Sequence, residues 1–180
     1  TRLPYVKRVS RRLRLDFRDA TMVPISMQDP SHESKGMPNR TAIASLTRRA
    51  VIDVGTNSVK LLVADVAAGC VAPVFETSQQ TRLGAGFYEN QILQRDAIDR
   101  TAKAVADLAA EAAHWRAGSI RVIATSAARD ARNQGDLQSA IQKASGLAVE
   151  VISGEQEADW VFAGVASDPA LAAQPLLILD

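Results

Sequence analysis

Residues 50–66 read AVIDVGTNSVKLLVADV, and this stretch decides the fold class. Two apolar runs, Ala50–Val54 and Val59–Val66, flank four polar residues: Gly55, Thr56, Asn57 and Ser58. Branched apolar side chains favour strands, and small polar residues between two such runs are typical of a turn. The stretch therefore predicts two strands around a polar turn.

The rest of the chain extends this pair into an α/β fold. Further strands are predicted at Val71–Phe75, Ile120–Thr125, Val149–Ile152 and Pro175–Asp180. Helices are predicted at Ile92–Trp115, from Ala127 to about Ala144 with a break near Asn133–Gly135 and Gly146 as C-cap, and at Gly154–Ala166. The order βββαβαβαβ indicates an antiparallel meander followed by parallel strands added through right-handed crossovers. We expect a mixed sheet with helices on both faces.

Composition excludes several classes of protein. The chain has 180 residues, of which 47% are hydrophobic and 23% charged, so it is not a disordered chain. No apolar run approaches the roughly 20 residues that a membrane helix needs. The single cysteine, Cys70, excludes an internal disulfide, and the two histidines, His32 and His114, are too few for a Cys/His zinc cluster. We expect a protein of the reducing cytoplasm without a membrane partner.

Charge divides the chain into two parts. Residues 1–48 contain ten Lys or Arg and four Asp or Glu, a net charge of +6, whereas residues 49–180 contain eleven and sixteen, a net charge of −5. A protein that coats nucleic acid does not have this distribution, and we expect no nucleic-acid partner. The prediction is a basic, disordered extension over residues 1–48 and a globular lobe over residues 49–180.

The role of the extension stays open. A basic tail binds RNA or an anionic surface, and a transit peptide has similar composition, although Asp16 and Asp19 argue against the latter. Alternatively, translation begins later, for example at Met37, and the first residues are not a functional element.

The turn after the first strand is the first candidate site. Backbone N–H groups and two hydroxyls from residues 55–58 suit a phosphate, and Asp53 at the strand end suits Mg²⁺ or a water beside it. A plain hairpin turn explains the same residue types.

A second candidate lies where the predicted strand Ile120–Thr125 meets the next helix. Thr125, Ser126 and Arg129 place two hydroxyls and a guanidinium at a predicted helix N-terminus, which is an arrangement that binds phosphate. The alternative is an ordinary N-cap with a solvated arginine.

A third candidate opens the last predicted helix. Ser153 and Gln156 fit a capping box, and Glu155 and Glu157 suit the positive end of the helix dipole. In a functional interpretation, one of these glutamates takes a proton from an attacking water. The residues themselves leave both interpretations open.

In this order and spacing the segments resemble the exopolyphosphatase/guanosine pentaphosphate phosphohydrolase (Ppx/GppA) family. The resemblance covers roughly residues 49–180, and the family's first loop usually has serine in place of Thr56. Four stretches carry it: VIDVGTNSVKLLVADV (51–66), TRLGAGF (81–87), ATSAARDARN (124–133) and VEVISGEQEADWVFAGV (149–165).

The resemblance implies an actin/Hsp70/sugar-kinase-like (ribonuclease H-like) lobe and hydrolysis of a terminal phosphoanhydride of polyphosphate or guanosine pentaphosphate. It implies Glu157 as the catalytic base, phosphate contacts from the residues of the first two motifs, and Mg²⁺ at Asp53 and Asp180. It also implies that Asp180 precedes a glycine-rich loop and a second lobe. We therefore expect a fragment that is inactive alone, taken from a homodimeric cytoplasmic protein.

Two other functions stay open. One is an actin-like ATPase or sugar kinase of the same superfold, against which the second and third motifs argue together. The other is a non-catalytic module that binds polyphosphate or the pentaphosphate alarmone.

Overall fold

A computed structural model of the chain describes residues 46–67 and 70–167. Its elements are β1 (Thr47–Val54), β2 (Ser58–Ala67), β3 (Cys70–Gln80), α1 (Phe87–Asn90), α2 (Arg95–His114), β4 (Ser119–Ala124), α3 (Ser126–Arg129), α4 (Gln134–Ser145), β5 (Val149–Val151) and α5 (Gly154–Ala166). The predicted strand Pro175–Asp180 and most of the predicted extension lie outside the described residues. Two residues assigned to that extension, Thr47 and Arg48, lie in β1.

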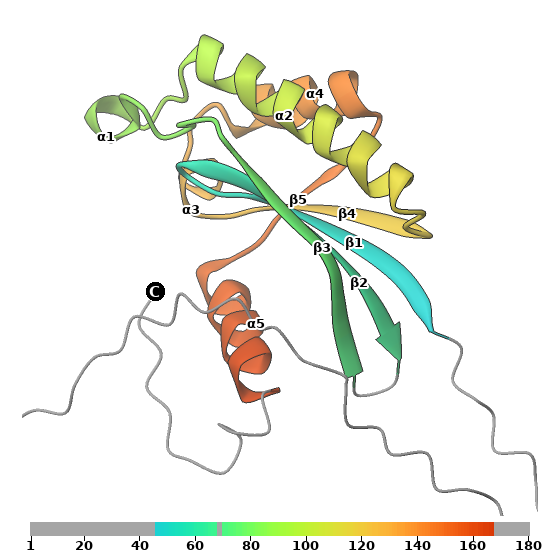
Figure 1. The fold of residues 1–180 in the computed structure, drawn as a ribbon. Coiled ribbons are helices and arrows are strands. Elements are labelled where there is room, and N and C mark those ends of the chain that lie inside the picture. The colour runs from blue at the N-terminus through green and yellow to red at the C-terminus, as the bar shows by residue number, and fades with distance from the viewer. Residues whose placement is uncertain (1–45, 68–69, 168–180) are drawn as a thin grey trace, which may run out of the picture. The chain divides into compact units, whose positions relative to one another are not determined.

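The described strands form one mixed sheet in the order β3-β2-β1-β4-β5 (Figure 1). β1 pairs antiparallel with β2, and β2 with β3, whereas β4 runs parallel to both β1 and β5. This topology confirms the meander and the parallel additions. Because β1, β4 and β5 are parallel, their carboxyl ends meet at one edge of the sheet, where ligands bind in such folds.

One face of the sheet packs against α2 and α4. The alternate β1 residues Ala50, Ile52 and Val54 are all at most 2% exposed, as the period of two requires. On α2, the predicted stripe that includes Ile98 and Leu108 is buried against them. Each large apolar side chain buried this way contributes about 1.5–3 kcal/mol to folding. This packing holds β1 rigidly at the centre of the sheet.

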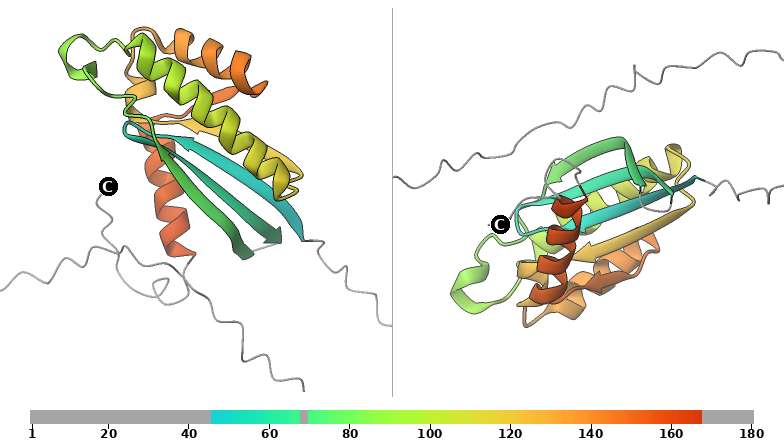
Figure 2. Two further views of the ribbon diagram at one scale, coloured as in Figure 1. Left: turned by 45° about the horizontal axis from the view of Figure 1, so that its top comes forward. Right: turned by 90° about the horizontal axis from the view of Figure 1, so that it is seen from below.

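The other face of the sheet is occupied by α5 (Figures 1 and 2). Trp160 of α5 lies beside Val51 and Ile123. The Arg121 guanidinium lies over the Trp160 ring, with Cζ 5.5 Å from the ring centre. Cover on this face is incomplete, because Trp160 remains 40% exposed and no residue of α5 is buried. Helices therefore lie on both faces, as predicted, and among the described residues a closed core lies on one face only.

The structure differs from the predicted elements in several places. β3 continues past Phe75 to Gln80, because its backbone pairs with β2 as far as Ser58 even where its side chains are polar. α1 was not predicted, and α2 begins at Arg95 rather than at Ile92. None of the helices in the described part of the chain is long and apolar enough to cross a bilayer.

The helical region predicted from Ala127 is two helices, α3 and α4. The predicted break near Asn133–Gly135 is present, but it begins earlier and spans residues 130–133. Asn133 causes it: its side-chain oxygen accepts from Leu93 N at 2.9 Å, and its Nδ2 donates to Leu93 O at 3.0 Å. This contact also keeps the backbone at Leu93 out of α2. The predicted C-cap is confirmed, since Gly146 has a left-handed φ of 73°.

Candidate functional site

The β1–β2 turn is a closed four-residue loop. Gly55 N donates to Ser58 O at 3.1 Å. The loop begins at the carboxyl end of β1, and Val54 pairs with Val59 on its antiparallel side and with Ala124 on its parallel side. Register therefore places this turn beside the segment that follows β4.

A second segment, residues 81–84, braces the turn from outside. Asn57 O accepts from Thr81 N at 3.1 Å and from Arg82 N at 2.9 Å, and Thr56 O accepts from Gly84 N at 2.9 Å. Arg82 has a φ of 52°, a conformation that is uncommon for residues other than glycine. In the sequence this segment was part of the TRLGAGF stretch that carries the family resemblance, but none of its residues was assigned to a site.

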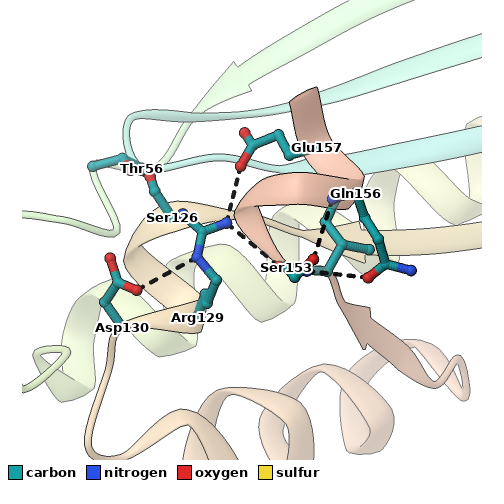
Figure 3. Close-up of polar contacts among 8 residues, drawn as sticks. Thr56, Ser126, Arg129, Asp130, Ser153, Gln156 and Glu157 are labelled. Atoms are coloured by element: carbon teal, nitrogen blue, oxygen red, sulfur yellow. Dashed lines mark hydrogen bonds and ion pairs between the residues drawn. The ribbon is translucent and has the colours of Figure 1, made fainter. Parts of the chain in front are cut away.

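The first two motifs meet through their hydroxyl groups. Thr56 Oγ1 and Ser126 Oγ are 2.9 Å apart and hydrogen-bonded, although 70 residues separate them in the chain (Figure 3). Thr125 lies at the N-cap of α3, but its side chain makes no cap hydrogen bond. The ordinary N-cap interpretation of this motif is therefore wrong, and both side chains of the Thr56–Ser126 pair are partly exposed.

Arg129 occupies a different helical position from the one predicted. It is the last residue of α3, which has only four residues, so it does not lie one turn inside a long helix. The helix-dipole argument for an anion site at this position is correspondingly weak. The side chain instead reaches α5, where Arg129 Nη1 donates to Glu157 Oε2 at 3.0 Å and to Ile152 O at 3.4 Å.

The Arg129–Glu157 ion pair joins the second and third motifs. The two side chains are 28% and 27% exposed, and Asp130 adds a second carboxylate 3.4 Å from Arg129 Nε. The hydrogen bond that Arg129 donates to Glu157, more than any other contact, raises the pKa of the Arg129 guanidinium above its ordinary value. The guanidinium therefore stays cationic at every pH at which the protein is folded.

The capping box at the start of α5 is present in full. Ser153 Oγ accepts from Gln156 N at 3.1 Å, and Gln156 Oε1 accepts from Ser153 N at 3.2 Å. Of the two glutamates in the first turn, Glu157 points to Arg129 and is half-buried, whereas Glu155 is exposed. Capping therefore explains Ser153 and Gln156, but it does not explain the pairing of Glu157.

Asp53 lies in a hollow of about 620 Å³ on the sheet face that α5 occupies. Lys60 is directly opposite Asp53 across the antiparallel β1–β2 pair, and Ser78 and Glu76 of β3 continue the polar lining. Sequence reasoning missed Lys60. Its signal was present, because a tight turn centred on residues 56 and 57 places residues 53 and 60 side by side.

The donor set tests whether Mg²⁺ fits this site. Asp180, the second predicted metal ligand, lies outside the described residues. Among residues 46–67 and 70–167, no three His, Cys, Asp or Glu side chains gather as a metal cage. Mg²⁺ is commonly held by one or two carboxylates together with phosphate oxygens and water, and Asp53 in an open hollow matches that mode.

Comparison with known proteins matches this chain over its central and final parts. Residues 62–180 match the Ppx/GppA phosphatase family. The chain is 37% identical over 147 residues to exopolyphosphatase 2 of Mycobacterium tuberculosis. The matched region covers 76% of this chain and 46% of that protein. The chain thus spans about half the length of the curated relatives that it matches.

Solved structures of similar proteins share the fold. The crystal structure of the Aquifex aeolicus Ppx/GppA family member is 29% identical, has a TM-score of 0.64, and is matched over 70% of this chain and 41% of that chain. An exopolyphosphatase from Cytophaga hutchinsonii is 28% identical with a TM-score of 0.62, over 66% and 38% of the two chains. With the sheet order, these neighbours confirm the predicted actin/sugar-kinase-like fold.

Proposed function

This chain belongs to the Ppx/GppA phosphatase family, and we propose that the whole protein hydrolyses terminal phosphoanhydride bonds and releases orthophosphate. The substrate is inorganic polyphosphate, guanosine pentaphosphate or both. Similarity to a Mycobacterium tuberculosis exopolyphosphatase favours polyphosphate. The observation that carries the proposal is the meeting of the Thr56–Ser126 hydroxyl pair and the Arg129–Glu157 ion pair at the carboxyl-end edge of the sheet (Figure 3).

Phosphoryl transfer to water needs three things from a protein: a held phosphate, neutralised oxygens and an oriented nucleophile. The hydroxyls of Thr56 and Ser126, with the backbone of residues 55–58, supply donors for the phosphate oxygens. Arg129 supplies a cation beside them. Glu157 is the carboxylate in the first turn of α5 that points toward this cation. We assign it the role of the base that orients the attacking water and accepts its proton.

The reaction balances with these residues alone. The oxygen of the water bonds to the terminal phosphorus while the bond from that phosphorus to the bridging oxygen breaks in line. One proton of the water passes to a Glu157 carboxylate oxygen. The electron pair of the broken bond leaves with the shortened chain, and orthophosphate is released.

Mg²⁺ belongs to the same proposal. Asp53 would hold it, with Asp180 as the second carboxylate, and the ion would neutralise charge on the phosphate oxygens. Lys60, directly opposite Asp53, places a further positive charge in the hollow beside β1. We also propose that the whole protein is a cytoplasmic homodimer and that the lobe described here is inactive without the remainder of the site.

A phosphate-release assay on the whole protein tests this function. Long-chain polyphosphate, guanosine pentaphosphate and ATP are compared side by side, with and without Mg²⁺, and calorimetry measures binding of the first two. Orthophosphate release from either ligand supports the enzyme. Binding without release favours the non-catalytic module, and release only from ATP favours an actin-like ATPase.

A further inference from the structure

Gly84 and Thr56 are in closer contact than any other residue at position 84 allows. A Cβ atom at Gly84 would lie 2.4 Å from Thr56 Cγ2, well inside the contact distance of two carbon atoms. The φ of Gly84 is not in the left-handed region, so alanine suits its backbone and only the contact excludes it. The absence of a side chain at Gly84 is therefore used to accommodate the methyl group of Thr56.

We propose that Gly84 is a positioning residue for the phosphate site, because it holds the Thr56 side chain in the one rotamer that directs its hydroxyl to Ser126. This inference rests on the proposed function only for its consequence, which is phosphate binding. The contact itself is a property of the folded chain. Gly84 lies in the TRLGAGF stretch that carries the family resemblance, but it was not among the candidate site residues.

The backbone at Gly84 is not free to retreat from Thr56. Its N–H donates to Thr56 O at 2.9 Å, and the preceding residues Thr81 and Arg82 both donate to Asn57 O. Leu83, just before Gly84, is fully buried, and Phe87, three residues after it, is 5% exposed. Both side chains belong to the hydrophobic core. Moving this segment outward breaks three hydrogen bonds and withdraws two core side chains.

Rotation of the Thr56 side chain about χ1 relieves the contact with position 84 only by displacing the hydroxyl from Ser126. The three staggered positions on Thr56 Cβ now hold the methyl toward Gly84, the hydroxyl toward Ser126 and a hydrogen in the third. Only one other rotamer turns the hydrogen toward Gly84. The chirality of threonine then puts the methyl where the hydroxyl was, against Ser126, and the hydroxyl in the third position.

A methyl group at position 84 therefore removes a hydroxyl donor from the site, while the helices and strands of the fold stay in place. Serine in place of Thr56 has no Cγ2, so the same methyl group is accommodated while the hydroxyl stays beside Ser126. This difference predicts coupling between positions 84 and 56 that a purely structural role for Gly84 does not produce.

A double-mutant cycle on the whole protein tests the proposal, with KM for polyphosphate as the readout. Gly84→Ala should raise KM about tenfold, the factor for one hydrogen bond to a charged group. In the T56S background the same substitution should change KM less than about twofold. Gly135→Ala, at an open position in α4, is the matched control and should leave KM unchanged. Equal effects of Gly84→Ala in both backgrounds would overturn the proposal.

Thr56→Val serves if Gly84→Ala does not fold, because valine keeps the methyl facing Gly84 and loses only the hydroxyl. It should raise KM by a similar factor, and an unchanged KM contradicts the proposal. The Thr56 rotamer, measured by three-bond couplings to Cγ2 in an NMR spectrum, tests the Gly84–Thr56 contact separately from the proposed function. If the wild-type protein neither binds nor cleaves polyphosphate, the proposed function fails, while a changed rotamer in Gly84→Ala still supports the contact and an unchanged one refutes it.

Discussion

The guanidinium of Arg129, at the end of the helix after β4, donates to the carboxylate of Glu157, in the first turn of the helix after β5, at 3.0 Å. Neither helix contacts the other through a large apolar interface, since no residue of α5 is buried. The ion pair and the Arg129–Ile152 hydrogen bond are therefore the polar contacts that fix the start of α5 beside α3. They bring a cation and a candidate base to one place.

Glu157→Gln should lower kcat by roughly 10²–10⁴-fold in the whole protein with little change in substrate affinity. Glutamine keeps the size of the side chain and an acceptor for Arg129, but it does not take a proton from water. Steady-state phosphate release measures the effect. The control is Glu155→Gln, in the same helical turn but exposed, which should stay near the wild-type rate. A larger loss from the control would reverse the assignment.

Arg129→Ala should raise KM about 10–100-fold, because it removes a charge-assisted phosphate contact worth about 1.5–3 kcal/mol. A fall in kcat should accompany it, since Glu157 loses the partner that orients it. Arg132→Ala, an exposed arginine three residues later, is the control and should change neither constant. An unchanged KM together with a lowered Tm would mean that Arg129 only supports the fold.

Removal of residues 1–45 should leave the Tm unchanged, because their sequence lacks apolar periodicity and is interrupted by proline and glycine. Removal of residues 1–48 should lower it. The longer deletion takes away Arg48, which donates to both carboxylate oxygens of Asp65, at 2.8 and 2.9 Å, and accepts from Gly118 N through its carbonyl oxygen. Thermal melts of the two truncated proteins make the comparison, and equal Tm values would contradict it.

Asp65→Asn should lower the Tm at neutral pH, and the difference from wild type should shrink as the pH falls below about 4. The hydrogen bond from Arg48 lowers the pKa of the Asp65 carboxyl in the folded protein. Stabilisation by this pair is therefore complete above the unfolded-state pKa and is lost as the pH falls through the folded-state value. Melts from pH 7 to pH 3 measure it. Asp99→Asn, in an exposed ion pair on α2, should change little at any pH.

Local signals in the sequence predicted much of the fold. Alternating branched residues placed β1 and β2, the spacing of apolar residues by three and four placed the buried stripe of α2, and Gly146 marked the end of α4. The bounds of α5 were predicted without error, and its start follows from the capping box that Ser153 and Gln156 form. Each of these signals is a local pattern, formed by residues that lie near one another in the sequence.

Contacts across the chain decided the rest. The sequence marked a break near Asn133–Gly135, but the position of the break at residues 130–133 depends on the contact of Asn133 with the backbone of Leu93, 40 residues earlier. Likewise, the residue types left Glu155 and Glu157 equivalent. The family resemblance selected Glu157, and in the structure the position of Arg129 distinguishes the two side chains. The bracing of the β1–β2 turn by residues 81–84 arises in the same way.

The sequence by itself therefore determined the order of strands and helices, the topology class and the three segments that carry polar chemistry. Only the tertiary structure decided that the hydroxyls of Thr56 and Ser126, 70 residues apart, share a hydrogen bond, and that Gly84 lies against the same turn. The physical reason is that helix and strand signals repeat every two to four residues. A side-chain contact between distant segments depends on sheet register and packing, which no short stretch of sequence contains.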